Sequence, residues 1–562
     1  MFKNVFWKRR FFIFWHLFKS RDFKQLAQRL LIFSSRVFNS KKPPEYEKWR
    51  KKWVEISPEI RNLIRNQVSQ MTERPLFNFV IHANPDDIAE LRVSLSSILS
   101  QLYPEWKVQI VTKNSLDREL CELLKHFNDK RIVLCEEISP FQECWVGQIK
   151  PGDSLYETAL FLMAVSASLN PKSEILYSDH DHLTPEGLFV DPYMKSDWNP
   201  DLLSGTYYFS ILTMFKASIW EEYFENSETI HEFSIKATEK VDKDSVLHLP
   251  YVLASQKIDG DGSHLTPLFT KPTYEIPLPH PKVSVLIPTK DKGKLLDKCL
   301  SSLLDETNYK NFEIVIVDHE SSEHKAVETL RTFREKDNVK ILSYRGNFNF
   351  SEMINKAADS ASGEIFVLLN NDIEIINQDW LKELVSHVLR PEVGVVGSLL
   401  LFPDLTVQHA GVHPGVGGLM GHGHKHWLGD SSGYFGRLKI AHEVAAVTGA
   451  CMAIESKTWS DLGGLNAAEL AVAYNDVDLC LKAREKGLRV VLNPYSVLIH
   501  HESATRGTDI GSVRQARLEK ELQYMKKRWG DKLKVDPAYN PNLHLGDESF
   551  TLADSPRKNL FF

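Results

Sequence analysis

Cysteines and long apolar runs are both scarce in this chain of 562 residues. The six cysteines are scattered and form no CxxC pair, so the sequence predicts neither a disulfide framework nor a cysteine-based zinc site. A reducing compartment fits this usage best. The apolar stretch from Phe11 to Phe18 is much shorter than the about 20 residues that cross a bilayer. No small-residue cleavage site follows it, so we expect neither a transmembrane helix nor a signal peptide.

Acidic residues are rare in the first fifty or so positions, although the whole chain has a net charge of −6. Basic residues such as Lys8, Arg9 and Arg10 are mixed there with aromatic ones such as Trp7 and Phe12. This mixture predicts an amphipathic helix that lies on an anionic membrane surface. The alternative is a basic helix packed on the protein itself. Nucleic-acid binding is not expected, because the rest of the chain is acidic.

The composition shows no sign of disorder, collagen or coiled coil. Its 43% hydrophobic and 25% charged residues are those of an ordinary globular protein. A single core stops growing at about 250 to 300 residues, so we expect two domains with extensions. The predicted boundaries are a basic helical N-terminal extension over 1–72, a first domain over 73–275, a second over 281–510, and a C-terminal helix and tail over 511–562. The proline-rich segment IPLPHPK links the two domains.

Strands and helices alternate in both predicted domains, which indicates an α/β fold with a mostly parallel, Rossmann-like sheet. The predicted strands include FNFVIHA and WKVQIVT in the first domain, and VSVLIPT, FEIVIVD, NVKILSY and EIFVLLN in the second. The stretch SLSSILSQLYPEWKVQIV also pairs in pattern with CLSSLLDETNYKNFEIVIV. The chain is therefore predicted to be an internal duplication of one α/β domain. Such sheets bind ligands at the carboxyl ends of their strands.

Polar residues follow two predicted strands of the second copy. Asp318 ends FEIVIVD, where a carboxylate can bind a base or ribose or can simply cap the next helix. Asn370, Asn371 and Asp372 follow an apolar strand, and their oxygens suit Mg²⁺ or Mn²⁺, although an ordinary turn has the same composition. About a hundred residues later, Asp476 lies in the first turn of a predicted helix, where it is either a cap or a rigidly held general base.

Residues 281 to 510 resemble the family 2 inverting glycosyltransferases of the GT-A fold, and specifically the bacterial members that build O-antigen and other surface polysaccharides, many of them described as rhamnosyltransferases. Eight stretches carry the resemblance in order: VSVLIPTKD, EIVIVDHES, NFSEMINKAADSASGEIFVLLNNDIEI, QHAGVHPGVGGLMGH, AVTGACMAI, LGGLN, NDVDLCLKAREKGLRVVLNP and LIHHESATRG. The tail DPAYNPNLHL also resembles the end of those proteins. The similarity therefore covers nearly the whole chain and implies two tandem GT-A-like domains.

The resemblance implies that the second domain binds a nucleotide diphosphate sugar. Thr289 and Asp318 are expected to hold the base and ribose, and Asn355 lies in the helix before the metal motif. Asn371 and Asp372 complete the expected nucleotide-sugar site.

The resemblance also implies a metal ligand set and a catalytic base. Asn370-Asn371-Asp372 occupies the family's DxD position, with Asn370 in place of the first acid and Asp372 as the retained ligand of Mg²⁺ or Mn²⁺. His500, rather than His501, is expected as a further ligand. Asp476 matches the base that deprotonates the acceptor hydroxyl, and attack opposite the diphosphate inverts the anomeric carbon.

The expected partners follow from the same family. The donor is expected to be a dTDP- or UDP-sugar, with rhamnose the leading candidate, and the acceptor a growing glycan or a lipid-linked one. The protein is expected to be cytoplasmic and peripheral on the inner face of a bacterial membrane. A transferase with both domains active, a non-catalytic scaffold of a polysaccharide assembly complex, and a hydrolase with two facing carboxylates are the alternatives.

Five histidines gather in QHAGVHPGVGGLMGHGHKHW. We expect a mobile glycine-rich loop that closes on the donor sugar, with a zinc site or a plain surface loop as alternatives. The spacing lacks the HExxH pattern of zinc enzymes.

The first copy lacks the corresponding polar residues. Thr112, Lys113 and Asn114 replace the nucleotide-binding acids, and Lys150, Pro151 and Gly152 replace the metal motif, leaving only Asp153. A lysine in a cation site repels the metal. The helix IHEFSIK lacks an aspartate where the base should be. The first domain is therefore predicted to be non-catalytic.

One first-copy stretch keeps a DxD spelling, at Asp179 and Asp181. It lies downstream of the expected metal motif, so we interpret it as a structural loop. A residual or acceptor-side role is the alternative.

Overall fold

The computed structural model describes residues 43–113, 115, 117–258, 271–501, 512–546 and 550–558. The predicted membrane-surface helix near the N-terminus lies outside the described residues. Among the helices that are described, none is long and apolar enough to cross a membrane. The chain divides into two compact units. The described N unit comprises 43–258, Tyr539–Leu543 and 552–558, and the described C unit comprises 271–Ala538 and the described part of His544–Thr551.

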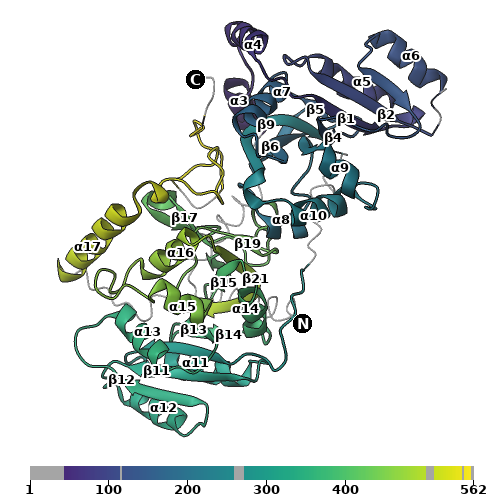
Figure 1. The fold of residues 1–562 in the computed structure, drawn as a ribbon. Helices are drawn as coiled ribbons and strands as arrows, with labels where there is room; N and C mark the ends of the chain where they lie inside the picture. Colours follow the sequence, from purple (N-terminus) through teal and green to yellow (C-terminus); the bar gives the residue numbers. More distant parts are fainter. Residues whose placement is uncertain are drawn as a thin grey trace, which may run out of the picture. The chain divides into compact units, whose positions relative to one another are not determined.

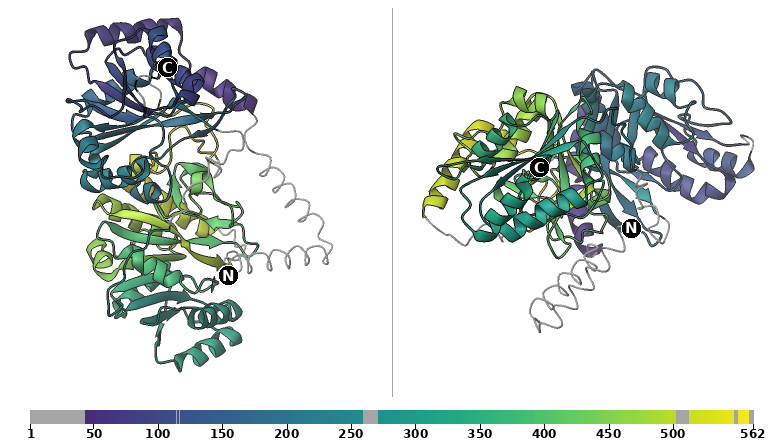
Figure 2. Two further views of the ribbon diagram at one scale, coloured as in Figure 1. Left: turned by 90° about the vertical axis from the view of Figure 1, so that its right-hand side faces the viewer. Right: turned by 90° about the horizontal axis from the view of Figure 1, so that it is seen from below.

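The two units contain sheets of the same strand order, which confirms the predicted duplication and the α/β fold class. The C unit has the order β12-β11-β10-β13-β20-β15-β21-β14, and the N unit has β3-β2-β1-β4-β8-β6-β9-β5. Each position in one order has its counterpart in the other, so β1 corresponds to β10, β4 to β13 and β9 to β21. Figure 1 labels many of these strands, and Figure 2 gives two further views.

The C-unit sheet has a parallel half and a mixed half. The parallel strands are β10 (Val283–Thr289), β11 (Phe312–Asp318), β12 (Val339–Ser343) and β13 (Ile365–Leu369). The mixed half contains β14 (Ile373–Ile375), β15 (Val393–Leu401), β20 (Cys451–Glu455) and β21 (Arg489–His500), with the short β16 (Val407–His409) and β19 (His442–Glu443) at its side. A separate hairpin pairs β17 (Val412–Pro414) with β18 (Met420–His422).

Helices cover both faces of the C-unit sheet, as alternate side chains of β10 show. Val285 and Ile287 pack into a core with α11 (Gly293–Asp305), α12 (His324–Arg334) and α14 (Trp380–Val388). Leu286 packs on the opposite face into a core with α13 (Phe350–Asp359), α15 (Ser456–Leu462), α16 (Asn475–Glu485) and α17 (Ser512–Trp529). Burial on two faces explains why these strands are continuously apolar.

The N unit repeats this plan with shorter elements. Its strands are β1 (Phe77–His82), β2 (Trp106–Val111), β3 (Ile132–Cys135), β4 (Trp145–Gln148), β5 (Ser154–Leu155), β6 (Ile175–Leu183), β7 (Phe189–Tyr193), β8 (Thr213–Lys216) and β9 (Val246–Lys257). Its helices are α3 (Pro43–Trp53), α4 (Pro58–Gln70), α5 (Ile88–Leu99), α6 (Arg118–Phe127), α7 (Ala159–Leu169), α8 (Pro200–Gly205), α9 (Ala217–Tyr223) and α10 (Ile230–Lys240). Part of the predicted helical extension is thus seen as α3 and α4, and α4 packs into the N-unit core.

The C-terminal tail contributes to the N unit through two buried amides. Asn540 donates from Nδ2 to Asp179 Oδ2 at 2.7 Å, and Asn542 donates to the same oxygen at 3.3 Å. Asp179 is fully buried, and its Oδ1 lies 2.9 Å from Nε2 of His248. The tail thus supplies both donors that the structure describes for Asp179 Oδ2.

Candidate functional site

The carboxyl ends of three neighbouring parallel strands bring three predicted binding residues to one edge of the C-unit sheet. Thr289 ends β10 and stands in register with Asp318, which ends β11. Asn371 follows β13 and donates from Nδ2 to Thr289 Oγ1 at 2.8 Å. Asp318 is half-buried, and its Oδ1 accepts a hydrogen bond from the Ser321 amide at 3.2 Å. One oxygen of Asp318 therefore shapes the turn, as the capping alternative requires, while its place on this edge suits nucleotide binding.

Asp372 and His500 come from opposite parts of the sequence and meet beside β14. His500 ends β21, and its Nε2 lies 3.1 Å from Asp372 Oδ1. Both side chains are nearly buried. The ring of His501 instead has its Nε2 3.0 Å from Glu374 Oε2. The geometry thus places His500, and not His501, beside the predicted metal ligand.

The Asp372–His500 pair has the spacing of two neighbouring ligands of a small divalent ion. Neighbouring ligands of an octahedral ion bound at about 2.1 Å are separated by about 3.0 Å. Among the described residues, no group of three or more His, Cys, Asp or Glu side chains is arranged to hold a metal. The pair therefore fits an ion that keeps waters and substrate phosphates as its other ligands, as Mg²⁺ commonly does.

Asp476 lies in the first turn of α16, as the sequence predicts, and is held by backbone donors. Its Oδ2 accepts from the Gly449 amide at 2.8 Å and its Oδ1 from the Val477 amide at 2.8 Å. Tyr474, just before the helix, has a left-handed φ of 62°. A non-glycine residue in this region costs on the order of 1–3 kcal/mol and often marks a functional site.

A turn of three residues, Thr448 to Ala450, connects Asp476 with the metal motif. The Asn370 amide donates to the Ala450 carbonyl at 3.0 Å, while the next residue along the turn, Gly449, binds Asp476. The turn therefore places Asn370 and Asp476 on the same edge of the sheet. Its role was not visible in the sequence, because each of its partners lies at least 27 residues away.

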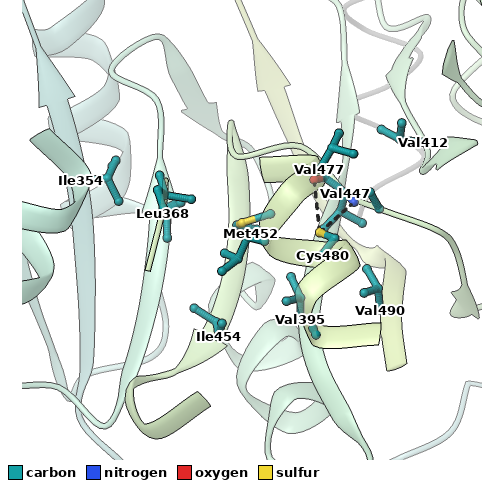
Figure 3. Close-up of a cluster of buried hydrophobic side chains, with 14 of the residues drawn as sticks. Ile354, Leu368, Val395, Val412, Val447, Met452, Ile454, Val477, Cys480 and Val490 are labelled. Atoms are coloured by element: carbon teal, nitrogen blue, oxygen red, sulfur yellow. Dashed lines mark hydrogen bonds between the residues drawn. The ribbon is translucent and has the colours of Figure 1, made fainter. Parts of the chain in front are cut away.

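The core beneath this turn fixes its position (Figure 3). Cys480 of α16 accepts a hydrogen bond on Sγ from the Val447 amide at 3.5 Å. Val447 packs over Gly397 of β15, where a side chain would lie 2.5 Å from Val447 Cβ. Helix α16, strand β15 and the turn are thus packed as one body.

Much of the histidine-rich segment, which was predicted to be a mobile loop, is packed against the rest of the C unit. His413 is fully buried, and its Nδ1 lies 2.7 Å from Asp536 Oδ2. The ring of buried His424 stacks on Phe550 with centroids 4.2 Å apart. Both partners lie more than 100 residues away in the sequence, which is why the glycines alone suggested a loop. The described histidines form no three-residue metal cluster.

The side chain of Asn355 forms two hydrogen bonds with the backbone of Leu465. Its Oδ1 accepts from the Leu465 amide at 3.0 Å, and its Nδ2 donates to the Leu465 carbonyl at 2.8 Å. No hydrogen bond among the described residues joins Asn355 to the other predicted site residues. These contacts support a structural role, and its binding role stays a prediction.

In the N unit, the remaining aspartate near the counterpart of the metal motif binds backbone amides. Asp153 is buried, and its two oxygens accept from the amides of Lys150 at 3.1 Å and Lys257 at 3.0 Å. Burial raises the pKa of Asp153 to about 6. His231 is the second residue of α10, and Asp476 is the second residue of the corresponding helix α16. Neither residue therefore reproduces the surroundings of its C-unit counterpart, Asp372 or Asp476.

The predicted structural loop at Asp179 and Asp181 is instead the buried strand β6. Asp181 accepts from the hydroxyls of Tyr46 at 2.7 Å and Tyr156 at 2.8 Å. Asp179 is held by His248 and the tail amides described above. Both carboxylates are therefore engaged by protein groups, and the structural interpretation holds although the element is a strand.

Residues 284–455 match the family profile described as "Glycosyl transferase family 2". An uncharacterized protein of Sinorhizobium fredii is 33% identical over 564 aligned positions, which cover 91% of this chain. The O-antigen biosynthesis protein RfbC of Myxococcus xanthus is 32% identical over 532 positions, covering 85% of this chain. This chain spans 61% of the length of the first relative and 41% of the second.

A solved structure of the mannosyltransferase PcManGT from Pyrobaculum calidifontis, in complex with GDP-Man and Mn²⁺, matches at 19% identity with a TM-score of 0.33. The match covers 46% of this chain and 69% of that one.

Proposed function

We propose that the C unit, whose residues 284–455 match the profile "Glycosyl transferase family 2", is an inverting, metal-dependent glycosyltransferase. It transfers a sugar from a nucleotide diphosphate donor to an acceptor hydroxyl. One observation carries this proposal: the Thr448–Ala450 turn contacts both Asn370 of the metal motif and Asp476. Transfer from one bound donor needs a cation for the leaving diphosphate and a base for the acceptor hydroxyl on the same edge of the sheet.

The residues of the C unit have separate tasks in this proposal. Thr289, Asp318 and Asn371 bind the base and ribose. Asp372 and His500 hold Mg²⁺ or Mn²⁺, which when bound neutralises the charge of the departing diphosphate. These tasks prepare the donor for attack.

Asp476 performs the proton transfer. One of its carboxylate oxygens takes the proton of the acceptor hydroxyl, whose oxygen then attacks the anomeric carbon. The bond from that carbon to the diphosphate breaks on the opposite face, and the diphosphate leaves with the electron pair. The backbone donors at both Asp476 oxygens keep the carboxylate oriented, as a general base requires.

The substrates are proposed from the relatives and the resemblance. One relative is an O-antigen biosynthesis protein, so we propose a growing surface polysaccharide or a lipid-linked glycan as the acceptor. A dTDP- or UDP-sugar is the proposed donor, with rhamnose first to be tested. The proposed location is the cytoplasmic face of the membrane, where such acceptors are assembled.

The Asp476→Asn variant tests this function. We expect transfer to fall by about 10²- to 10⁴-fold, the usual contribution of a general base, while nucleotide binding stays within about twofold because the amide keeps the shape of the carboxylate. The assay is a screen of dTDP-, UDP- and GDP-sugars with Mn²⁺, with product detected by mass spectrometry. Asp461→Asn, an exposed change on α15, is the matched control. Full activity in Asp476→Asn would remove the assigned base.

A further inference from the structure

Gln408 lies in the three-residue strand β16 and contacts the side of His500 that faces away from Asp372. Its Oε1 is 2.7 Å from His500 Nδ1, and only 5% of the residue is exposed. Strand β16 pairs with β15 at Leu400 and His409, and β15 pairs with β21 up to Ile499. The sheet therefore holds Gln408 beside the end of β21, where His500 lies.

We propose that Gln408 is a positioning residue that fixes the ring orientation and the tautomer of His500 for cation binding. This inference rests on the proposed function of the C unit, in which Asp372 and His500 hold the ion. A second hydrogen bond supports the orientation of the Gln408 amide, since its Nε2 donates to the His500 carbonyl at 3.4 Å. The flipped amide would place two oxygens against each other, so Oε1 must face His500 Nδ1.

This orientation decides which ring nitrogen of His500 carries hydrogen. An amide oxygen can only accept, so Nδ1 must be the donor, and a metal-bound His500 ring must then use the lone pair of Nε2. That nitrogen faces Asp372 Oδ1 at 3.1 Å and lies 3.3 Å from the donor Nδ2 of Asn370.

The Nε2 atom of His500 and the Oδ1 atom of Asp372 are thus separated by about the spacing of neighbouring ligands around an octahedral ion. In the proposed enzyme a divalent ion would bind to both atoms. Histidine ligands of metals usually donate their second N–H to an oxygen acceptor, and the loss of that acceptor weakens metal binding by about 10- to 100-fold. Gln408 supplies such an acceptor to His500.

The test compares Gln408→Met, which keeps the approximate size but removes the acceptor, with Gln408→Glu, whose protonated carboxylic acid keeps an acceptor for His500 Nδ1 and a donor for the His500 carbonyl. Mn²⁺ alone is titrated into the full chain and followed by electron paramagnetic resonance. We expect the Mn²⁺ dissociation constant of Gln408→Met to rise about 10- to 100-fold, and that of Gln408→Glu to stay at or below the wild-type value. Gln378→Met, an exposed change, is the matched control.

Pulsed electron paramagnetic resonance adds a measurement whose result would not change if Gln408 had a purely structural role. Bound Mn²⁺ should show coupling to a histidine nitrogen, which is lost in His500→Ala and in Gln408→Met but kept in Gln408→Glu. Loss of that coupling in a folded Gln408→Glu would overturn the role of Gln408, as would an unchanged signal and affinity in Gln408→Met. If Asp372→Ala leaves Mn²⁺ binding unchanged, or if the wild type binds none, the cation site fails and this inference fails with it.

Discussion

Asp372 and Asp153 each come directly before corresponding strands, β14 and β5, but they have different surroundings. Asp153 accepts from two backbone amides, whereas Asp372 faces the ring of His500. The sequence predicted the loss of function at Asp153 from its neighbour Lys150. It could not reveal Gln408, because the partner that gives this residue its role lies 92 positions away.

Glu313 at the start of β11 allows a prediction about pH. Burial opposes ionisation of this carboxyl, but donors from Ser284, Lys282 and Ser362 outweigh it and hold its pKa at about 2. The folded pKa is below the ordinary value of about 4.3. The stabilisation is therefore fully present above about pH 4.3 and disappears as pH falls towards about 2.

We expect Glu313→Gln to lower the free energy of unfolding at pH 7, and the difference from wild type to shrink steadily below about pH 4. Urea unfolding at several pH values measures this. The exposed Glu335→Gln is the control. A gap between Glu313→Gln and wild type that widens as the solution becomes more acidic would contradict the assignment.

At the scale of single elements, the strands and helix α16 could be predicted because their apolar patterns are local. The strands of the parallel half read as buried apolar runs, and Asp476 falls in the predicted first turn. The strand β6 was missed because its buried aspartates look like a loop until their distant partners are known. The hairpin of β17 and β18 was missed for the same reason, since His413 depends on Asp536.

The packing of strand β15 against the segment next to the Thr448–Ala450 turn allows a second prediction. In Gly397→Ala the new methyl group would lie 2.5 Å from Val447 Cβ, so we expect the turn to shift and transfer activity to fall more than tenfold. Overpacking of this kind typically costs about 1–3 kcal/mol of stability.

Gly147→Ala on β4 of the N unit is the matched control, because its methyl group would lie 2.5 Å from Met214 Sδ, away from the turn and from α16. We expect that variant to lose stability but, assayed well below its melting temperature, to keep transfer activity. Equal losses of transfer in both variants would show that the effect comes from lost stability and not from the turn.

At the scale of the whole molecule, two copies of one topology differ in the residues at corresponding positions. The duplication could be predicted because both copies keep the same order of apolar strands and helices. The membership of Tyr539–Leu543 in the N unit could not, since it depends on hydrogen bonds between residues more than 300 positions apart.

The proposed inactivity of the N unit predicts the behaviour of His231→Ala. His231 holds the helix position of the proposed base Asp476 but belongs to the unit proposed to be inactive. Its loss should therefore leave transfer within about twofold of wild type, whereas Asp476→Asn should nearly abolish it. The same donor screen measures both, with thermal melting to confirm folding. A tenfold fall in His231→Ala with an unchanged melting temperature would favour two active domains.

The tail amides Asn540 and Asn542 also impose an order on biosynthesis. Residues 43–258 leave the ribosome early, yet Asp179 must wait for its last two donors until the C-unit segment that ends at Ala538 has been translated. Nascent chains should therefore carry an N unit with an incompletely satisfied interior carboxylate, open to proteolysis and to chaperones, until the final stretch of synthesis completes it.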